Sequence, residues 1–233
     1  GHEVFNKIEN SSTVTIALTT GLALGGGLEL ALSCDYRIGT NRTQFRFPET
    51  NIGIYPGLGG TQRTTRICGL EIARYAVLAG NFLNSETAKA FGLLTHLVDV
   101  NDIDKTIYEI INLGKNNDKY LKNSIDEDHS IVKFARRFYT DENLYSILNG
   151  SDLEDLDMSD NQVSRQIKSL SRTAPIALST ASKLLDIANN KDTEFNQGLK
   201  QELDNLEYIF STSDSLEGLS ALIEGRRAKY KNS

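Results

Sequence analysis

Residues 21–35 constrain this chain more than any other stretch, because their local chemistry contradicts simple packing. A run rich in β-branched residues ends at Gly21, three glycines follow at positions 25–27, and an apolar helix then opens with a carboxylate, Glu29. Glycine lets backbone N–H groups approach a ligand closely, and a helix start carries unpaired donors and a partial positive charge. The stretch therefore predicts a place where developing negative charge is held.

The spacing of the glycines excludes two common phosphate-binding loops. A dinucleotide fingerprint that starts at Gly25 requires glycine or alanine where Leu30 stands, and a phosphate loop through the same glycines requires a lysine at position 27. The second glycine cluster, residues 57–60, fails because position 62 is Gln62. What remains is a donor at a helix N-terminus with Glu29 one turn further in, as in an oxyanion site beside an acid or base.

Glu29 and Glu49 are the candidate acid–base residues. Glu29 interrupts a predicted helix, residues 26–34, that is apolar on nearly all sides. Because a buried carboxylate without a partner is costly, Glu29 either caps or ion-pairs within the core or works in a site. Glu49 directly follows Pro48 on a segment that continues to Gly57, which is either a loop carrying catalytic groups or a surface turn. The two carboxylates together favour the functional interpretation.

Composition narrows the class of protein. The 233 residues carry a formal net charge of −6, with 39% hydrophobic and 24% charged residues, which is typical of a soluble globular protein and argues against general nucleic-acid binding. Residues 10–28 are uncharged but rich in threonine, serine and glycine, so no membrane span is predicted. Two cysteines without pairing or metal spacing predict a reducing, cytoplasmic location, and three scattered histidines predict no metal site.

Alternating strand and helix patterns in the first hundred residues predict an α/β fold. Strands are predicted over 13–20, 35–39, 44–47 and 94–100, and helices over 1–10, 26–34, 61–68, 70–78 and 85–91. After Asp102 the pattern becomes all-helical, with a helix to about Lys122 and closing helices over 173–187, 193–210 and 215–230. A capping-box variant of Asp214 and Glu217 is expected to start the last helix.

Three motifs occur in a fixed order and spacing between residues 4 and 100. They are Gly21-Leu-Ala-Leu-Gly-Gly-Gly-Leu-Glu29, Phe47-Pro48-Glu49 and Gly53-Ile-Tyr-Pro-Gly-Leu-Gly-Gly-Thr-Gln-Arg63, and a fourth, Glu217-Gly218-Leu219-Ser220-Ala221, follows near the C-terminus. These motifs resemble the central motifs of the crotonase superfamily, and of enoyl-CoA hydratases within it. The segment Ala174-Pro175-Ile176-Ala177-Leu178 resembles the hydratase half of the archaeal fusion of 3-hydroxyacyl-CoA dehydrogenase with enoyl-CoA hydratase.

The resemblance implies a lyase that hydrates 2-trans-enoyl-CoA to 3-hydroxyacyl-CoA in fatty-acid β-oxidation. By similarity, Glu29 activates water and Glu49 protonates C2. Gly26, with its neighbour Gly25, supplies an oxyanion donor, and the backbone of Gly57 helps to place the water.

The implied substrate brings CoA with it, and no tightly bound cofactor is implied. By similarity, the basic residues Arg227 and Lys229 are candidate CoA contacts. Their alternative role is that of cations at a helix C-terminus.

The resemblance also implies an organisation of the chain. Residues 1–102 are expected to form a partial crotonase-like ββα spiral, residues 103–172 a helical insertion, and residues 173–233 a helical region that packs across a homotrimer or hexamer. In the family an upstream portion carries the first strands and a second oxyanion donor. An N-terminally truncated hydratase with a fused or adjacent 3-hydroxyacyl-CoA dehydrogenase domain is therefore expected.

Other reactions and another class stay open. An enoyl-CoA isomerase needs only one carboxylate, whereas a 3-hydroxyisobutyryl-CoA hydrolase is expected to carry aspartate in place of Gly57 and no glutamate in place of Glu29. Both residue identities favour hydration within the superfamily. A non-catalytic assembly fragment that oligomerises through its C-terminal helices is the alternative from a different class.

Overall fold

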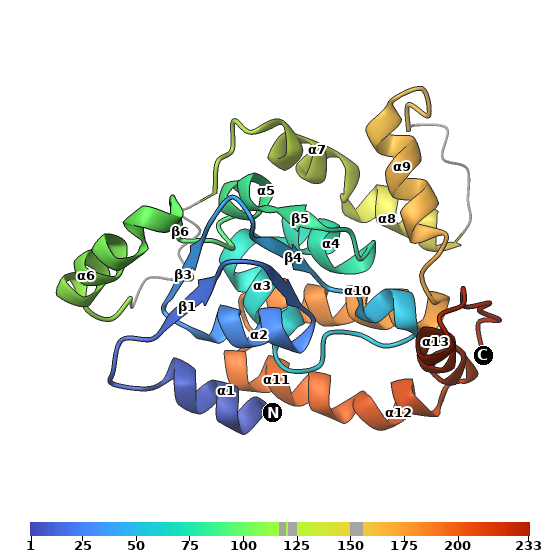
Figure 1. The fold of residues 1–233 in the computed structure, drawn as a ribbon. Helices are drawn as coiled ribbons and strands as arrows, with labels where there is room; N and C mark the ends of the chain where they lie inside the picture. Colours follow the sequence, from blue (N-terminus) through green and yellow to red (C-terminus); the bar gives the residue numbers. More distant parts are fainter. Residues whose placement is uncertain (117–119, 121–124, 150–155) are drawn as a thin grey trace.

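The computed structural model describes residues 1–116, 120, 125–149 and 156–233, and two small sheets form its β-layer (Figure 1). The first sheet is parallel, and its strands lie in the order β1 (Ile16–Thr19), β3 (Tyr36–Gly39) and β6 (His96–Leu97). The second pairs β2 with β4 in parallel and β4 with β5 antiparallel, in the order β2 (Leu22–Leu24), β4 (Gln44–Arg46) and β5 (Leu83–Asn84). Consecutive strands β1 and β2 each form one edge of a sheet.

Helices make up most of the rest of the described chain. Those up to residue 102 are α1 (His2–Glu9), α2 (Gly26–Ser33), η1 (Glu49–Ile52), α3 (Gly60–Cys68), α4 (Leu70–Leu78), α5 (Ser85–Ala90) and η2 (Val100–Asp102). Those that follow are α6 (Ile103–Leu113), α7 (Ser130–Phe138), α8 (Asp141–Asn149), α9 (Asn161–Leu170), α10 (Pro175–Asn189), α11 (Phe195–Asp204), α12 (Leu206–Ser211) and α13 (Ser213–Glu224). In the described part of the chain, every regular element after Leu97 is helical, as the pattern predicts.

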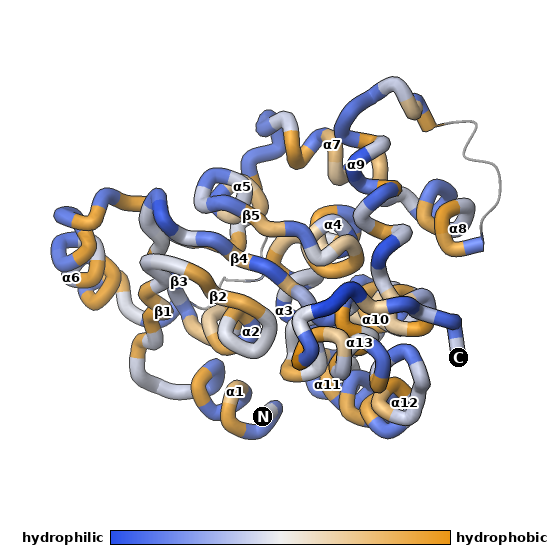
Figure 2. Tube along the Cα trace, turned by 45° about the vertical axis from the view of Figure 1, so that its right-hand side comes forward, coloured by the Kyte–Doolittle hydropathy of each residue, from blue (hydrophilic) through white to orange (hydrophobic). Residues whose placement is uncertain are grey.

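The core lies where α10 packs on α3 and α4 and where α2 packs on α3. Its buried side chains include Leu28 and Leu32 of α2 and Ile72 of α4, each fully enclosed. The rings of Tyr75 on α4 and Phe134 on α7 meet edge to face at 6.2 Å, which attaches α7 to the same core. Figure 2 shows α10 as largely hydrophobic and the tail after α13 as mostly hydrophilic. Helices α2 and α3 thus pack directly on the hydrophobic core.

Several predicted boundaries differ from those in the structure. The helix expected to reach about Lys122 ends at Leu113, because Gly114 takes a φ of +79°; residues 117–119 and 121–124 lie outside the described part of the chain. The strand expected over 94–100 pairs only at β6. The helix expected over 193–210 is divided into α11 and α12 at Asn205.

The last helix also differs from its prediction. It begins at Ser213, and its N-cap is Thr212, whose hydroxyl accepts from the N–H of Ser215. Asp214 instead accepts from the backbone of the tail, so the predicted capping box is wrong. The helix ends at Glu224 because Gly225 adopts the left-handed conformation that commonly ends helices, and residues 226–233 follow as a tail.

Candidate active site

A glycine turn opens the site between β2 and α2. Gly25 has a φ of +49° and donates its N–H to the carbonyl of Arg46 at 3.0 Å, and α2 begins at Gly26. A Cβ added to Gly25 would lie 2.5 Å from Oε1 of Glu49. The turn needs glycine both for its conformation and for its contact with the Glu49 carboxylate. The first N–H groups of α2, starting at Gly26, have no partner within the helix itself.

Glu29 lies one turn into α2 and is only 2% exposed. Its Oε1 accepts hydrogen bonds from the N–H groups of Leu58, at 2.7 Å, and Gly60, at 2.8 Å. Burial, followed by the nearby charge of Glu202, raises the pKa of Glu29 to about 7, while the two N–H donors and Arg63 oppose that rise. Glu29 can therefore exchange a proton near neutral pH.

Glu49 opens η1 directly after Pro48 and is 7% exposed. Its Oε2 is buried and has no hydrogen-bond partner among the described residues. Burial, followed by the charge of Glu29, raises the pKa of Glu49 to about 8, against the opposing effects of its own backbone N–H and of Arg46. A buried carboxyl group with an unpartnered oxygen is expected to hold its proton, and it has one atom available for another molecule.

The predicted site residues fall into two groups. Gly25, Gly26, Glu29 and Glu49 are brought together, since a Cβ on Gly25 would clash with Glu49 and the charge of Glu29 raises the pKa of Glu49. Gly57 lies in the turn that leads into α3, where an added Cβ would come within 3.2 Å of a methyl group on α12. The roles of these residues remain predictions.

Sequence reasoning missed Glu202. This residue lies on α11, is fully buried, and accepts from the N–H of Gly59 at 2.7 Å. The signal was present, because Phe195, Leu199 and Glu202 follow helical spacing and the glutamate takes a position on the inward stripe. A lone carboxylate at a core position is the same anomaly that singled out Glu29.

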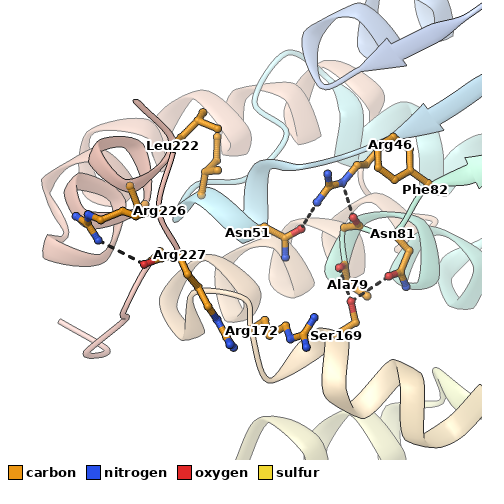
Figure 3. A pocket seen from close by; sticks show the side chains of 15 residues that line it. Arg46, Asn51, Ala79, Asn81, Phe82, Ser169, Arg172, Leu222, Arg226 and Arg227 are labelled. Carbon is orange, nitrogen blue, oxygen red and sulfur yellow. Dashed lines mark hydrogen bonds between the residues drawn. The ribbon is translucent and has the colours of Figure 1, made fainter. Parts of the chain in front are cut away.

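A cavity of about 610 Å³ lies between β4, η1, the α9–α10 connection and α13 with its tail. The charged residues that line this cavity are arginines, namely Arg46, Arg172, Arg226 and Arg227 (Figure 3). Arg46 is held by the carbonyl of Gly80 and the amide oxygen of Asn51, and Arg226 by Glu217 and Glu224.

Arg172 and Arg227 carry two further positive charges into the same cavity. The lining does not include the other predicted CoA contact, Lys229, whose backbone N–H donates to Glu217 at 2.8 Å. Among the described residues, no group of three or more histidine, cysteine, aspartate or glutamate side chains is arranged to hold a metal ion. No helix in the described ranges has both the length and the apolarity needed to cross a membrane.

Together, the fold and the site define an α/β protein with paired buried carboxylates beside a glycine turn, an arrangement suited to acid–base enzymes. A sequence model of the enoyl-CoA hydratase/isomerase family matches residues 2–232. The chain belongs to this family, which confirms the predicted relationship to the crotonase superfamily.

Known proteins agree with this assignment. The chain is 38% identical over 112 residues, 48% of its length, to the short-chain-enoyl-CoA hydratase of Clostridium acetobutylicum, of which it covers 43%. It is 37% identical over 121 residues, 51% of its length, to the fatty acid oxidation complex subunit alpha of Vibrio parahaemolyticus, of which it covers 17%. The chain thus spans less than half the length of these curated relatives.

The fold has solved counterparts. The carnitinyl-CoA dehydratase of Mycobacterium thermoresistibile superposes with a TM-score of 0.75 at 19% identity, covering 98% of this chain and 66% of that one. The predicted crotonase-like α/β fold with a helical C-terminal region is therefore confirmed. The boundaries of the predicted insertion, 103–172, include residues outside the described ranges and stay a prediction.

Proposed function

We propose that the protein hydrates 2-trans-enoyl-CoA to 3-hydroxyacyl-CoA, as in fatty-acid β-oxidation. The observation that carries this proposal is the buried pair of Glu29 and Glu49. Burial raises the pKa values of both carboxyl groups towards neutral pH, to about 7 and about 8. Hydration adds the hydroxyl of water to C3 and a proton to C2, so the site needs one group that accepts a proton and another that gives one. Two carboxyl groups in different environments supply both.

The surroundings of the two carboxyl groups support Glu29 as the base and Glu49 as the acid. Glu29 accepts two backbone N–H hydrogen bonds, which favour the ionised form that accepts a proton from water. Oε2 of Glu49 has no hydrogen-bond partner among the described residues, which favours the protonated form that delivers a proton to C2. Because the two groups interact, the pH dependence belongs to the pair. The N–H of Gly26 at the start of α2 is proposed to stabilise the thioester oxyanion, and the Gly57 backbone to help place the water.

The arginine-lined cavity supports CoA as the carrier part of the substrate. CoA bears several phosphate oxygens, and arginine binds phosphate through charge-assisted hydrogen bonds. We propose Arg227 as a contact for these phosphates, with Lys229 as a weaker contact beside the cavity. No tightly bound cofactor is required for this chemistry.

The remaining proposals concern assembly and location. Exposed apolar side chains on α13, namely Leu216, Leu222 and Ile223, support a homotrimer or hexamer formed through the C-terminal helices. A fused or adjacent 3-hydroxyacyl-CoA dehydrogenase domain and a cytoplasmic location also remain proposals. The second of these rests on the cysteine content of the chain.

The direct test follows the loss of enoyl-thioester absorbance when crotonyl-CoA is mixed with the folded protein. We expect hydration in the wild type, and a loss of roughly a hundredfold or more in both Glu29→Gln and Glu49→Gln, since each removes one proton-transfer group. Asp204→Asn, which changes an exposed carboxylate on α11, serves as the control and should retain full rate.

Two results would contradict the proposal. Full hydration by both glutamine variants would remove the carboxylate pair from the mechanism. Shifting of the double bond of a 3-enoyl-CoA, without hydration of crotonyl-CoA, would instead assign the isomerase reaction that the family also includes.

A further inference from the structure

Glu202 is bound from several directions at the N-terminus of α3. Its carboxylate accepts from the N–H of Gly59 at 2.7 Å and from the hydroxyl of Thr61, with a longer contact to the N–H of Gln62 at 3.4 Å. The ring nitrogen Nε2 of His2, on α1, lies 3.0 Å from the same carboxylate. A carboxylate at this end of α3 satisfies donors that the helix leaves unpaired.

The main chain of Glu202 also binds the segment that leads into α3, residues 55–61, hereafter the 55–61 turn. The hydroxyl of Tyr55 donates to the Glu202 carbonyl, so both ends of the 55–61 segment are attached to one residue of α11. Tyr55 is 2% exposed, and its ring therefore cannot swing out without opening the core.

The three consecutive N–H groups at the centre of this turn alternate between two carboxylates. Leu58 and Gly60 donate to Glu29, and Gly59, between them, donates to Glu202. Fixing the Gly59 N–H on one side of the turn presents its two neighbours to the other side. The hydrogen bond from Gly59 to Glu202 thus stabilises the conformation of the turn in which Leu58 and Gly60 bind Glu29.

We propose that Glu202 is a positioning residue for Glu29, because it fixes the 55–61 turn that binds Glu29 and places a second negative charge beside it. This inference rests on the proposed role of Glu29 as the base. It assigns to α11 a part in the chemistry, although Glu202 itself is not proposed to touch the substrate.

The charges around the two carboxylates set the direction of the effect. Glu29 faces Glu202 of α11, Glu49 of η1 and Arg63 of α3, while Glu202 faces His2 of α1. The negative charge of Glu202 raises the pKa of Glu29. Replacing that charge with a neutral amide of the same shape should lower the pKa of Glu29, because the like charge is lost. The amide oxygen can still accept a hydrogen bond from the turn.

The experiment titrates the side-chain carboxyl carbon of Glu29 by NMR in the absence of substrate. In Glu202→Gln, we expect the midpoint to fall by about one pH unit, because a nearby like charge disfavours ionisation of a carboxyl group. Asp204→Asn, two residues away on α11 but exposed, should leave the midpoint unchanged. An unchanged midpoint in folded Glu202→Gln overturns the proposal.

A second variant keeps the test decisive if Glu202→Gln does not fold. Tyr55→Phe removes only the hydroxyl that anchors the turn to α11. Amide exchange at Leu58 and Gly60 should then accelerate by about tenfold, the consequence of losing one buried hydrogen bond. The amide of Gly69, bonded to the Thr65 carbonyl at the far end of α3, is the internal reference.

Equal exchange at Leu58 and Gly60 in wild type and Tyr55→Phe would also overturn the proposal. Both readouts are measured without turnover, so failure of the hydratase assignment and failure of this inference are separate results. In turnover, the acid limb of the pH profile of kcat should shift to lower pH in Glu202→Gln.

Discussion

At the scale of single residues, Gly25 and Gly27 differ in whether they can be replaced by a residue with a side chain. An added Cβ at Gly25 would meet Glu49 at 2.5 Å, and its φ of +49° disfavours any other residue. At Gly27, a Cβ would find no atom within 4 Å. Gly25→Ala should therefore displace the Glu49 carboxylate and destabilise the fold by about 1–2 kcal/mol. Gly27→Ala should stabilise α2 by about 0.5–1 kcal/mol.

Urea unfolding and the crotonyl-CoA assay measure this contrast. Gly27→Ala is the matched control for the loss of hydration expected in Gly25→Ala. Equal effects of the two substitutions on stability would mean that a Cβ at position 25 does not clash with Glu49 strongly enough to destabilise the fold.

The raised pKa of Glu49 predicts a stability that falls as the pH rises. From its ordinary value of 4.5 up to about 8, the folded state holds the proton that the unfolded chain releases, so ionisation favours unfolding across this range. Glu49→Gln cannot ionise. It should raise the Tm at pH 8 by about 5 °C, equivalent to on the order of 2 kcal/mol, and leave it nearly unchanged at pH 4.5.

Calorimetry at both pH values measures the effect. Glu86→Gln, an exposed carboxylate on α5, provides the comparison and should follow the wild-type curve at both. A Tm for Glu49→Gln below that of the wild type at pH 8 would show that the ionised carboxylate is stabilised in the fold.

The sequence singled out Glu29 and Glu49 because a carboxylate in an apolar helix and one after a proline are local anomalies. It did not predict that Leu58 and Gly60 donate to Glu29, since that contact depends on the path of the turn before α3. Helical spacing marked Glu202 as an inward-facing carboxylate, but its contact with the turn could not be predicted locally, because its donor Gly59 lies 143 residues away.

At the scale of elements, helix prediction succeeded where local signals decide. The predicted helix over 70–78 agrees with α4, and the predicted starts at 26 and 61 agree with α2 and α3 to within one residue. Prediction failed where one glycine adopts a positive φ, as at Gly225, because the sequence continues with charged residues that suit a helix. Because α13 ends early, residues Arg226, Arg227 and Ala228 of the tail lie in the lining of the arginine-lined cavity.

That placement predicts a role for Arg227 in CoA binding. Arg227→Ala should weaken CoA binding about tenfold or more, because one charge-assisted hydrogen bond to phosphate is lost. Arg165→Ala, which removes an exposed arginine on α9 outside the cavity lining, should bind as the wild type does. Isothermal titration with CoA decides between them, and equal affinity of all three proteins would exclude the cavity as the CoA site.

At the scale of the whole molecule, apolar side chains remain exposed at the end formed by α13. Ile223 is 86% exposed and Leu216 is 69% exposed on this helix, while α6 projects at the opposite end (Figure 1). If these side chains pack across copies of the chain, light scattering should give three or six times the protomer mass of 25.8 kDa.

Ile223→Glu should reduce that mass to one protomer, because it places a charge in the proposed contact. Tyr108→Glu alters a side chain of α6 that is 73% exposed, and it should leave the mass unchanged. A wild type that is already monomeric at micromolar concentration would contradict the proposed assembly.

The attachment of the 55–61 turn to α11 also has a consequence during synthesis. A ribosome adds about 5–20 residues per second, so on the order of ten seconds separate the incorporation of Gly59 from that of Glu202, 143 residues later. Throughout that interval, the nascent chain carries Glu29 and the turn without the residue that joins them to α11. The proposed base thus acquires its final surroundings only after α11 has emerged, however early its own helix forms.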